Sequence, residues 1–103
     1  MNKEPLLRVR EEILAHPELL DMREWCGTPC CIAGHLAKES NHPGYTFALA
    51  TEILGLDEGE AYNLFISSFW PKPLLTRHIN AENPAERAQV AAEAIDWFIS
   101  EYE

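Results

Sequence analysis

Apolar residues recur along this chain at the three- and four-residue spacing of amphipathic helices, and turn-forming residues separate the periodic stretches. The first stretch covers residues 5–15, and its apolar face consists of Leu6, Val9, Ile13 and Leu14. Pro5 suits the first turn of a helix, where its missing N–H is not needed, and Pro17 ends the stretch. We expect residues 18–25 to form a short segment that packs onto the core.

Two more helices are expected before the middle of the chain. One starts at Thr28, which can cap the free N–H groups, with Pro29 at the first helical position, and it continues through Ala37 until residues 41–44 end it. The other covers about residues 46–54. Gly55 then suits the left-handed conformation with which many helices end.

The second half of the chain repeats this alternation of helices and turns. Asp57 and Glu60 have the spacing of a capping box, which predicts a helix whose inward side chains are Ala61, Leu64 and Phe65. Residues 67–73 form a turn in which Phe69 and Trp70 precede two prolines, Pro71 and Pro73, and residues 74–79 form a short helical turn.

The last helix has the clearest signature. Asn83 caps it, Pro84 opens it and Glu86 stands three residues after the cap. Its main apolar stripe consists of Ala88, Ala91, Ala92, Ile95, Phe98, Ile99 and Tyr102, and a flanking stripe consists of Val90, Ala94 and Trp97. If the monomer leaves Trp97 uncovered, the flanking stripe becomes a homodimer or partner face, but large apolar side chains mostly supply the core.

No stretch shows the period-two alternation of a strand pair, so the sequence predicts an all-α fold. We expect residues 1–103 to form one compact single-domain bundle of about five short helices. The hydrophobic fraction of 47% is enough for a real core. We find no apolar run long enough for a membrane span and no signal peptide, and an odd cysteine count with two adjacent cysteines does not suit a secreted disulfide framework. We therefore expect a cytoplasmic protein that does not bind membranes.

The charge balance bears on the class of partner. The chain has 17 acidic and 8 basic residues, a formal net charge of -9. Such charge repels phosphate backbones, which disfavours direct binding of nucleic acid. It suits a protein partner with a basic surface, including the nucleic-acid-binding surface of another protein, although acidity can also serve solubility alone. The leading hypothesis is a non-enzymatic, acidic protein-interaction module.

Special residues are densest between Cys26 and Gly34. The pattern Cys-Gly-Thr-x-x-Cys-x-Ala-Gly, carried by Cys26, Gly27, Thr28, Cys31, Ala33 and Gly34, resembles a group of small, largely uncharacterised bacterial and phage proteins. Leu20 to Trp25, Leu54 to Asp57, Leu64-Phe65 and Trp70-Pro71 also fit the group. The resemblance lends no catalytic residue, but it makes a phage or bacterial inhibitor or accessory role conceivable. The group commonly has Trp at the position of His35, and Cys30 falls at a variable position.

Three interpretations of the cysteines stay open. In the structural one, small residues such as Cys31 let another helix come close. In the redox one, Cys30 and Cys31 lie in the first turn of a helix, whose positive end lowers a thiol pKa, and Cys26 acts as the resolving thiol. A small thiol- or metal-dependent enzyme is the corresponding alternative function. The spacing differs from that of thioredoxin-like motifs, which favours the structural interpretation.

The third interpretation is a zinc site. Cys31 and His35 are four residues apart and therefore share a helical face, Cys26 could approach them, and the fourth ligand would be His16, His42 or His78. A closed zinc site usually has two ligand pairs, whereas this chain shows one. We therefore expect no cofactor, with zinc as the alternative.

A small anionic ligand is a further alternative. The free N–H groups of a helix starting at Thr28 could bind it, with Gly27, Cys30 and Cys31 beside it and Trp25 stacked on a planar group. We favour Trp25 as a core residue, because aromatic side chains commonly fill the core. The chain has no phosphate-binding glycine loop, no Gly-x-Ser-x-Gly and no His-Glu-x-x-His, so no catalytic residue is assigned.

Overall fold

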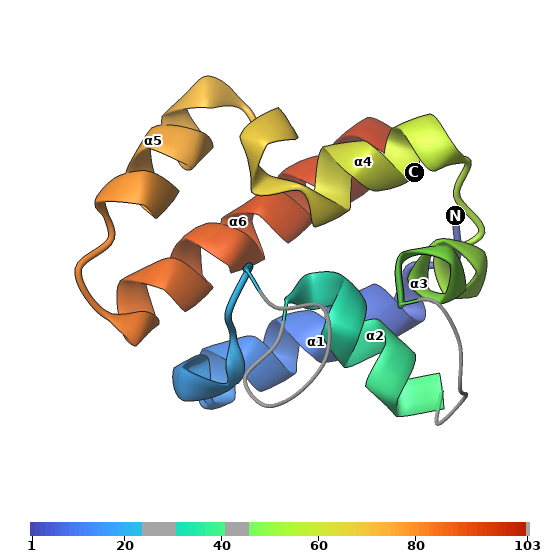
Figure 1. Cartoon of the computed structure of the whole chain (residues 1–103), viewed down its shortest axis with the longest axis horizontal. Helices are drawn as coiled ribbons and strands as arrows, with labels where there is room; N and C mark the ends of the chain where they lie inside the picture. The colour runs from blue at the N-terminus through green and yellow to red at the C-terminus, as the bar shows by residue number, and fades with distance from the viewer. Residues whose placement is uncertain (24–30, 41–45, 103) are drawn as a thin grey trace.

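The first and last helices of the chain pack against each other and carry much of the core. The computed structural model describes residues 1–23, 31–40 and 46–102. The elements in chain order are α1 (Glu4–Ala15), η1 (Pro17–Leu19), α2 (Ile32–Ser40), α3 (Thr46–Leu54), α4 (Glu58–Phe65), η2 (Ser67–Phe69), α5 (Lys72–Asn80) and α6 (Pro84–Tyr102). In Figure 1, α6 crosses the molecule diagonally, with α4 and α5 on one side and α1 on the other.

Alanines allow this close packing around α6. The fully buried side chains of α6 include Ala88, Ala91, Ala92 and Ala94, beside the larger Ile95 and Phe98. Because alanine is small, the neighbouring helices can approach the α6 backbone, and α1 fills the space with Leu6, Val9 and Ile13. At the edge of this contact, Arg10 Nε and Nη2 donate to the two carboxylate oxygens of Asp96 at 2.8 and 2.9 Å. This bidentate pair fixes how α1 lies along α6.

The turn between α3 and α4 combines two local signals. Gly55 has a φ of 69°, its N–H donates to the Glu52 carbonyl, and the Leu56 N–H donates to the Thr51 carbonyl, as in a Schellman motif. The Asp57 carboxylate then accepts the Glu60 N–H at 2.8 Å, while the Glu60 carboxylate accepts the Asp57 N–H at 3.0 Å. This capping box sets α4 at a defined angle to α3.

This capping box gives a first testable prediction. Replacing Asp57 with alanine removes the acceptor for the Glu60 N–H at the start of α4. We expect the free energy of unfolding to fall by about 1 kcal/mol, measured by urea denaturation. Asp57→Asn should lose much less, because an amide oxygen can still cap the helix. An equal loss in the two variants would contradict the role of this hydrogen bond.

Trp70 connects α4, η2 and α5. Its indole Nε1 donates to the Leu64 carbonyl at 2.9 Å, and its side chain is buried. The edge of the His78 ring contacts it, with centroids 5.2 Å apart. Arg77 donates to both carboxylate oxygens of Glu93 at 2.8 Å, which holds α5 against α6.

The all-α prediction is confirmed, since the described residues form helices and turns without a β-strand. The prediction of about five helices is low by one. Residues 74–79, expected to form only a short turn, belong to the nine-residue α5, because a proline in the first turn, here Pro73, is compatible with a helix. The Asn83–Glu86 cap is confirmed, with Glu86 N–H donating to Asn83 Oδ1 at 2.9 Å.

Two further expectations concern α2 and α6. Helix α2 begins at Ile32, so Cys31, expected in the first helical turn, lies just before the helix, and the predicted start at Thr28 lies outside the described residues. Within the flanking stripe of α6, Val90 and Ala94 are buried and Trp97 is half-buried against the core. The monomer therefore covers most of this stripe, and a homodimer through Trp97 stays a prediction.

Candidate functional site

Most residues of the predicted cysteine site lie outside the described part of the chain. These are Trp25, Cys26, Gly27, Thr28, Pro29 and Cys30, together with His42. Cys31 and His35 are described, and they lie one helical turn apart at the start of α2. What the structure says about the cysteine site therefore concerns these two side chains.

Cys31 is a buried cap of α2. Its side chain is 2% exposed, its Sγ accepts the Gly34 N–H at 3.4 Å, and its carbonyl accepts the His35 N–H. Burial raises the pKa of the Cys31 thiol, and the hydrogen bonds from the backbone N–H groups at the helix start offset this only in part. The expectation that the helix end lowers this pKa is therefore wrong for Cys31. A buried, protonated thiol is a poor nucleophile, which favours the structural interpretation.

His35 is a buried link between α2 and η1. It is 7% exposed, and its Nε2 lies 2.9 Å from the Leu19 carbonyl oxygen. This ring nitrogen therefore already has a protein partner. His16, one suggested fourth ligand, is exposed and lies 3.7 Å from the Glu18 carboxylate. Among residues 1–23, 31–40 and 46–102, no three His, Cys, Asp or Glu side chains come together in a way that could hold a metal ion.

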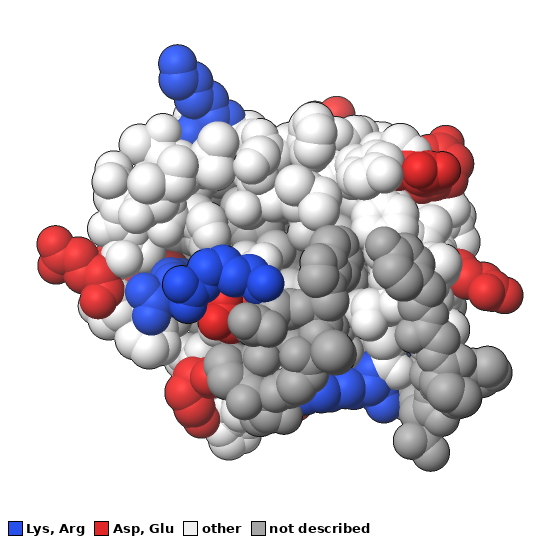
Figure 2. All heavy atoms as spheres, in the orientation of Figure 1, with Lys and Arg blue, Asp and Glu red and all other residues white. Residues whose placement is uncertain are grey.

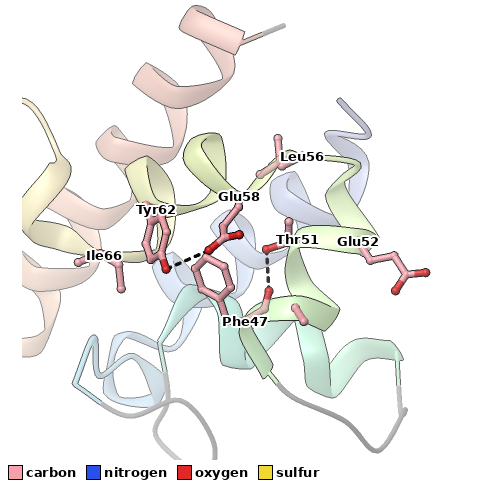
Figure 3. A pocket seen from close by; sticks show the side chains of 8 residues that line it. Phe47, Thr51, Glu52, Leu56, Glu58, Tyr62 and Ile66 are labelled. Atoms are coloured by element: carbon pink, nitrogen blue, oxygen red, sulfur yellow. Dashed lines mark hydrogen bonds between the residues drawn. The ribbon is translucent and has the colours of Figure 1, made fainter.

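A different feature has the form of a binding site. A groove of about 680 Å³ lies between α3 and α4 (Figure 3). Its lining residues are Phe47, Ala48, Thr51, Glu52, Leu56, Glu58, Tyr62 and Ile66. The Schellman turn at Gly55 and the capping box at Asp57 hold the two helices at the angle that opens this groove, which we call the α3–α4 groove.

Aromatic rings form one wall of the α3–α4 groove. The rings of Phe47 and Tyr62 are tilted against each other with centroids 5.0 Å apart, and Phe47 contacts the buried Phe65 edge-on at 5.8 Å. Tyr62 is 42% exposed, and Phe69, whose ring centroid is 6.3 Å from that of Tyr62, is 56% exposed. Rings held from behind in this way offer a rigid apolar surface to a partner.

The charged residues among the described lining of the α3–α4 groove are both acidic. Tyr62 donates its O–H to the Glu58 carboxylate at 3.3 Å, which holds that carboxylate beside the aromatic wall. The Glu52 side chain points away from the other lining side chains, at the rim (Figure 3). None of the described lining residues is basic. The groove therefore combines apolar contact area with two negative charges.

Sequence reasoning missed the α3–α4 groove. Phe47 lies in the helix expected over residues 46–54, where an apolar side chain is ordinarily taken to face the core, whereas the ring is half-buried and lines the groove. Sequence reasoning passed over Tyr62, although Tyr62 follows Ala61 and therefore lies off the inward face of α4. A large aromatic residue outside the apolar stripe of a short helix was the available signal.

Comparison with known proteins adds no match. Searches of protein-family models, of curated proteins and of solved structures each find nothing similar to this chain. The resemblance of residues 26–34 to a bacterial and phage group therefore stays a prediction. Within the described part of the chain, no helix has both the length and the apolar character needed to cross a membrane.

Proposed function

We propose that the chain is a non-enzymatic interaction module whose α3–α4 groove binds a basic, amphipathic segment of another protein. The observation that carries the proposal is the pairing of an aromatic wall, formed by the half-buried Phe47 and the exposed Tyr62, with two carboxylates among the described lining residues of the same groove. An apolar side chain of the partner would insert beside Phe47 and Tyr62. Lysine or arginine side chains one turn away would then meet Glu52 and Glu58, an arrangement that an amphipathic helix provides.

The charge of the whole chain supports the same partner chemistry. With a formal net charge of -9, the field around the molecule attracts a basic segment and speeds its encounter with the groove. An arginine that stacks on the exposed face of Tyr62 gains cation–π attraction as well. Nucleic-acid-binding proteins present basic surfaces of this kind, so we propose one of them as the partner. An inhibitor or accessory role in a phage or bacterium is the finer form of this proposal.

A designed peptide can test the proposal without knowledge of the natural partner. The probe is an amphipathic peptide with leucine and arginine at helical spacing, and the control peptide carries glutamate in place of arginine. We expect the basic peptide to bind, and its affinity to fall steeply with added salt because the attraction is between partly exposed charges. Fluorescence anisotropy of each labelled peptide measures its affinity for the protein.

Protein variants locate the binding. Tyr62→Ala should lower the affinity for the basic peptide by about thirtyfold, as expected for an aromatic side chain that anchors an interface. E52Q/E58Q should lower this affinity by roughly tenfold. The matched control E4Q/E12Q removes the same charge from exposed positions on α1 and should change affinity much less. Equal effects of the two double variants, binding that ignores salt, or equal binding of the acidic peptide would each contradict the proposal.

A further inference from the structure

Two exposed aromatic side chains lie next to each other where α4 ends. Tyr62 is 42% exposed, Phe69 on η2 is 56% exposed, and their ring centroids are 6.3 Å apart. Phe69 is not among the described residues that line the α3–α4 groove. The aromatic wall of Phe47 and Tyr62 therefore continues past the end of the groove onto η2. We call the rings of Phe47, Tyr62 and Phe69 the aromatic row.

The backbone on both sides of Phe69 is held in place. The Phe69 N–H donates to the Ile66 carbonyl at 2.9 Å, and the Ile66 N–H donates to the Tyr62 carbonyl at 3.1 Å. On the other side, the side chain of Trp70 is buried, and its Nε1 donates to the Leu64 carbonyl. The Phe69 ring is thus exposed although its backbone is fixed. A partner that packs on it orders only two side-chain torsions, so little conformational entropy is lost on binding.

The α3–α4 groove has an acidic end and an apolar end. In Figure 3, Glu52 and Ile66 lie at opposite ends of the groove, with Tyr62 and Glu58 between them. Because η2 follows directly after Ile66, Phe69 extends the apolar end. Figure 2 shows uncharged surface over η2 and the end of α4, and acidic side chains over the start of α4. A segment that lies along the aromatic row therefore meets carboxylates toward one end and a further ring at the other.

We infer that Phe69 is a second apolar anchor of the groove, which selects partner segments that carry two apolar side chains one helical turn apart. This inference rests on the proposed function. The first apolar side chain inserts beside Phe47 and Tyr62, and the second packs on Phe69. Residues four apart in a helix are separated by about 6 Å along its axis. The Tyr62 and Phe69 rings are 6.3 Å apart, which matches this spacing.

The occupant is therefore a basic amphipathic helix with two apolar anchors. Its basic side chains lie toward Glu52 and Glu58, because these are the charged residues of the described groove lining. Its second apolar side chain lies toward η2, where the surface in Figure 2 is uncharged. Apolar side chains at positions i and i+4 share one face of a helix, so one such segment can reach both anchors.

Two basic peptides and one protein variant test the role of Phe69. One peptide carries two leucines four residues apart, and the other has alanine in place of one of them. We expect the parent protein to bind the two-leucine peptide about tenfold more tightly than the single-leucine peptide. Phe69→Ala should lower the affinity for the two-leucine peptide by about tenfold and that for the single-leucine peptide by less than about twofold. Fluorescence anisotropy measures the four affinities, and the double-mutant cycle isolates the contact between Phe69 and the second leucine.

Ile79→Ala is the matched control. It also removes a large exposed apolar side chain, 69% exposed on α5, but Ile79 is not among the described residues that line the groove. Both peptides should bind this variant as they bind the parent protein. Circular dichroism checks that each variant is folded, and retained binding of the single-leucine peptide shows that the groove itself is intact in Phe69→Ala.

The outcomes separate this inference from the proposed function. If folded Phe69→Ala keeps the parent's preference for the two-leucine peptide, or loses affinity equally for both peptides, Phe69 is not the second anchor. The proposed function then still stands on the effects of salt, Tyr62→Ala and E52Q/E58Q. If neither peptide binds the parent protein, the proposed function and this inference are both overturned.

Discussion

Replacing Phe98 with alanine should lower the free energy of unfolding by about 3–5 kcal/mol, a large part of the total for a domain of this size. Phe98 is 0% exposed and lies at the centre of the contact between α6 and its neighbours. Its ring packs on Tyr102, with centroids 4.5 Å apart. The loss has two parts: the free energy that burial of the ring contributes in the parent protein, and the cost of the cavity that the missing ring leaves. Urea denaturation of the two proteins measures it.

Phe69 provides the matched control for this substitution. It is the same residue type, but its ring is 56% exposed on η2. Phe69→Ala should therefore change the free energy of unfolding by well under half of the Phe98→Ala loss, because little apolar area leaves the core. Similar losses in the two variants, or a Phe98→Ala loss below about 1 kcal/mol, would show that α6 does not carry the core in the way described.

The Cys31 thiol should be strongly protected from labelling in the native protein. In a variant with Cys26 and Cys30 replaced by serine, we expect a thiol reagent to react on the order of a hundredfold more slowly than in concentrated guanidinium chloride. Two causes act together: the side chain is 2% exposed, and burial raises the pKa of the thiol. Labelling at the rate of an exposed thiol would contradict the burial of Cys31 and revive the redox interpretation.

The raised pKa of Cys31 also gives a pH dependence. Above the ordinary thiol pKa of about 8.5, the unfolded chain loses the Cys31 proton while the folded chain keeps it. The folded state then binds more protons than the unfolded state, so stability falls as pH rises, by at most about 1.4 kcal/mol per pH unit. In the same serine background, Cys31→Ala should remove this part of the slope. Urea midpoints measured across alkaline pH compare the two proteins, and parallel curves would contradict the prediction.

Much of the fold could be predicted because its signals are local. The bounds of α3, the Gly55 stop, the Asp57–Glu60 capping box and the Asn83 cap each depend on residues within one or two turns of each other. The role of Cys31 could not be predicted in this way, since it was expected within the first turn of the helix, yet it precedes α2 and accepts the Gly34 N–H with its Sγ. Helix α5 was predicted too short because Pro71 and Pro73 were read as parts of a turn, whereas Pro73 lies in the first turn of the helix, where a proline is tolerated.

The α3–α4 groove was beyond sequence reasoning for a related cause. The groove exists because one turn brings Phe47 and Tyr62 together across two helices, with their rings tilted against each other. The cysteine segment drew attention because cysteine and histidine are chemically reactive residue types. Cys31, the cysteine that the structure describes, is buried in the core.

The pairing of α1 with α6 has a consequence for biosynthesis. Helix α1 leaves the ribosome before the other described helices, but α6, which covers its apolar face, is made after all of them, as the 86-residue separation of Arg10 and Asp96 illustrates. Loop closure of this length must precede the contacts that repay it. The nascent chain should therefore stay open to chaperones and proteases until α6 has emerged, and it should complete its core only afterwards.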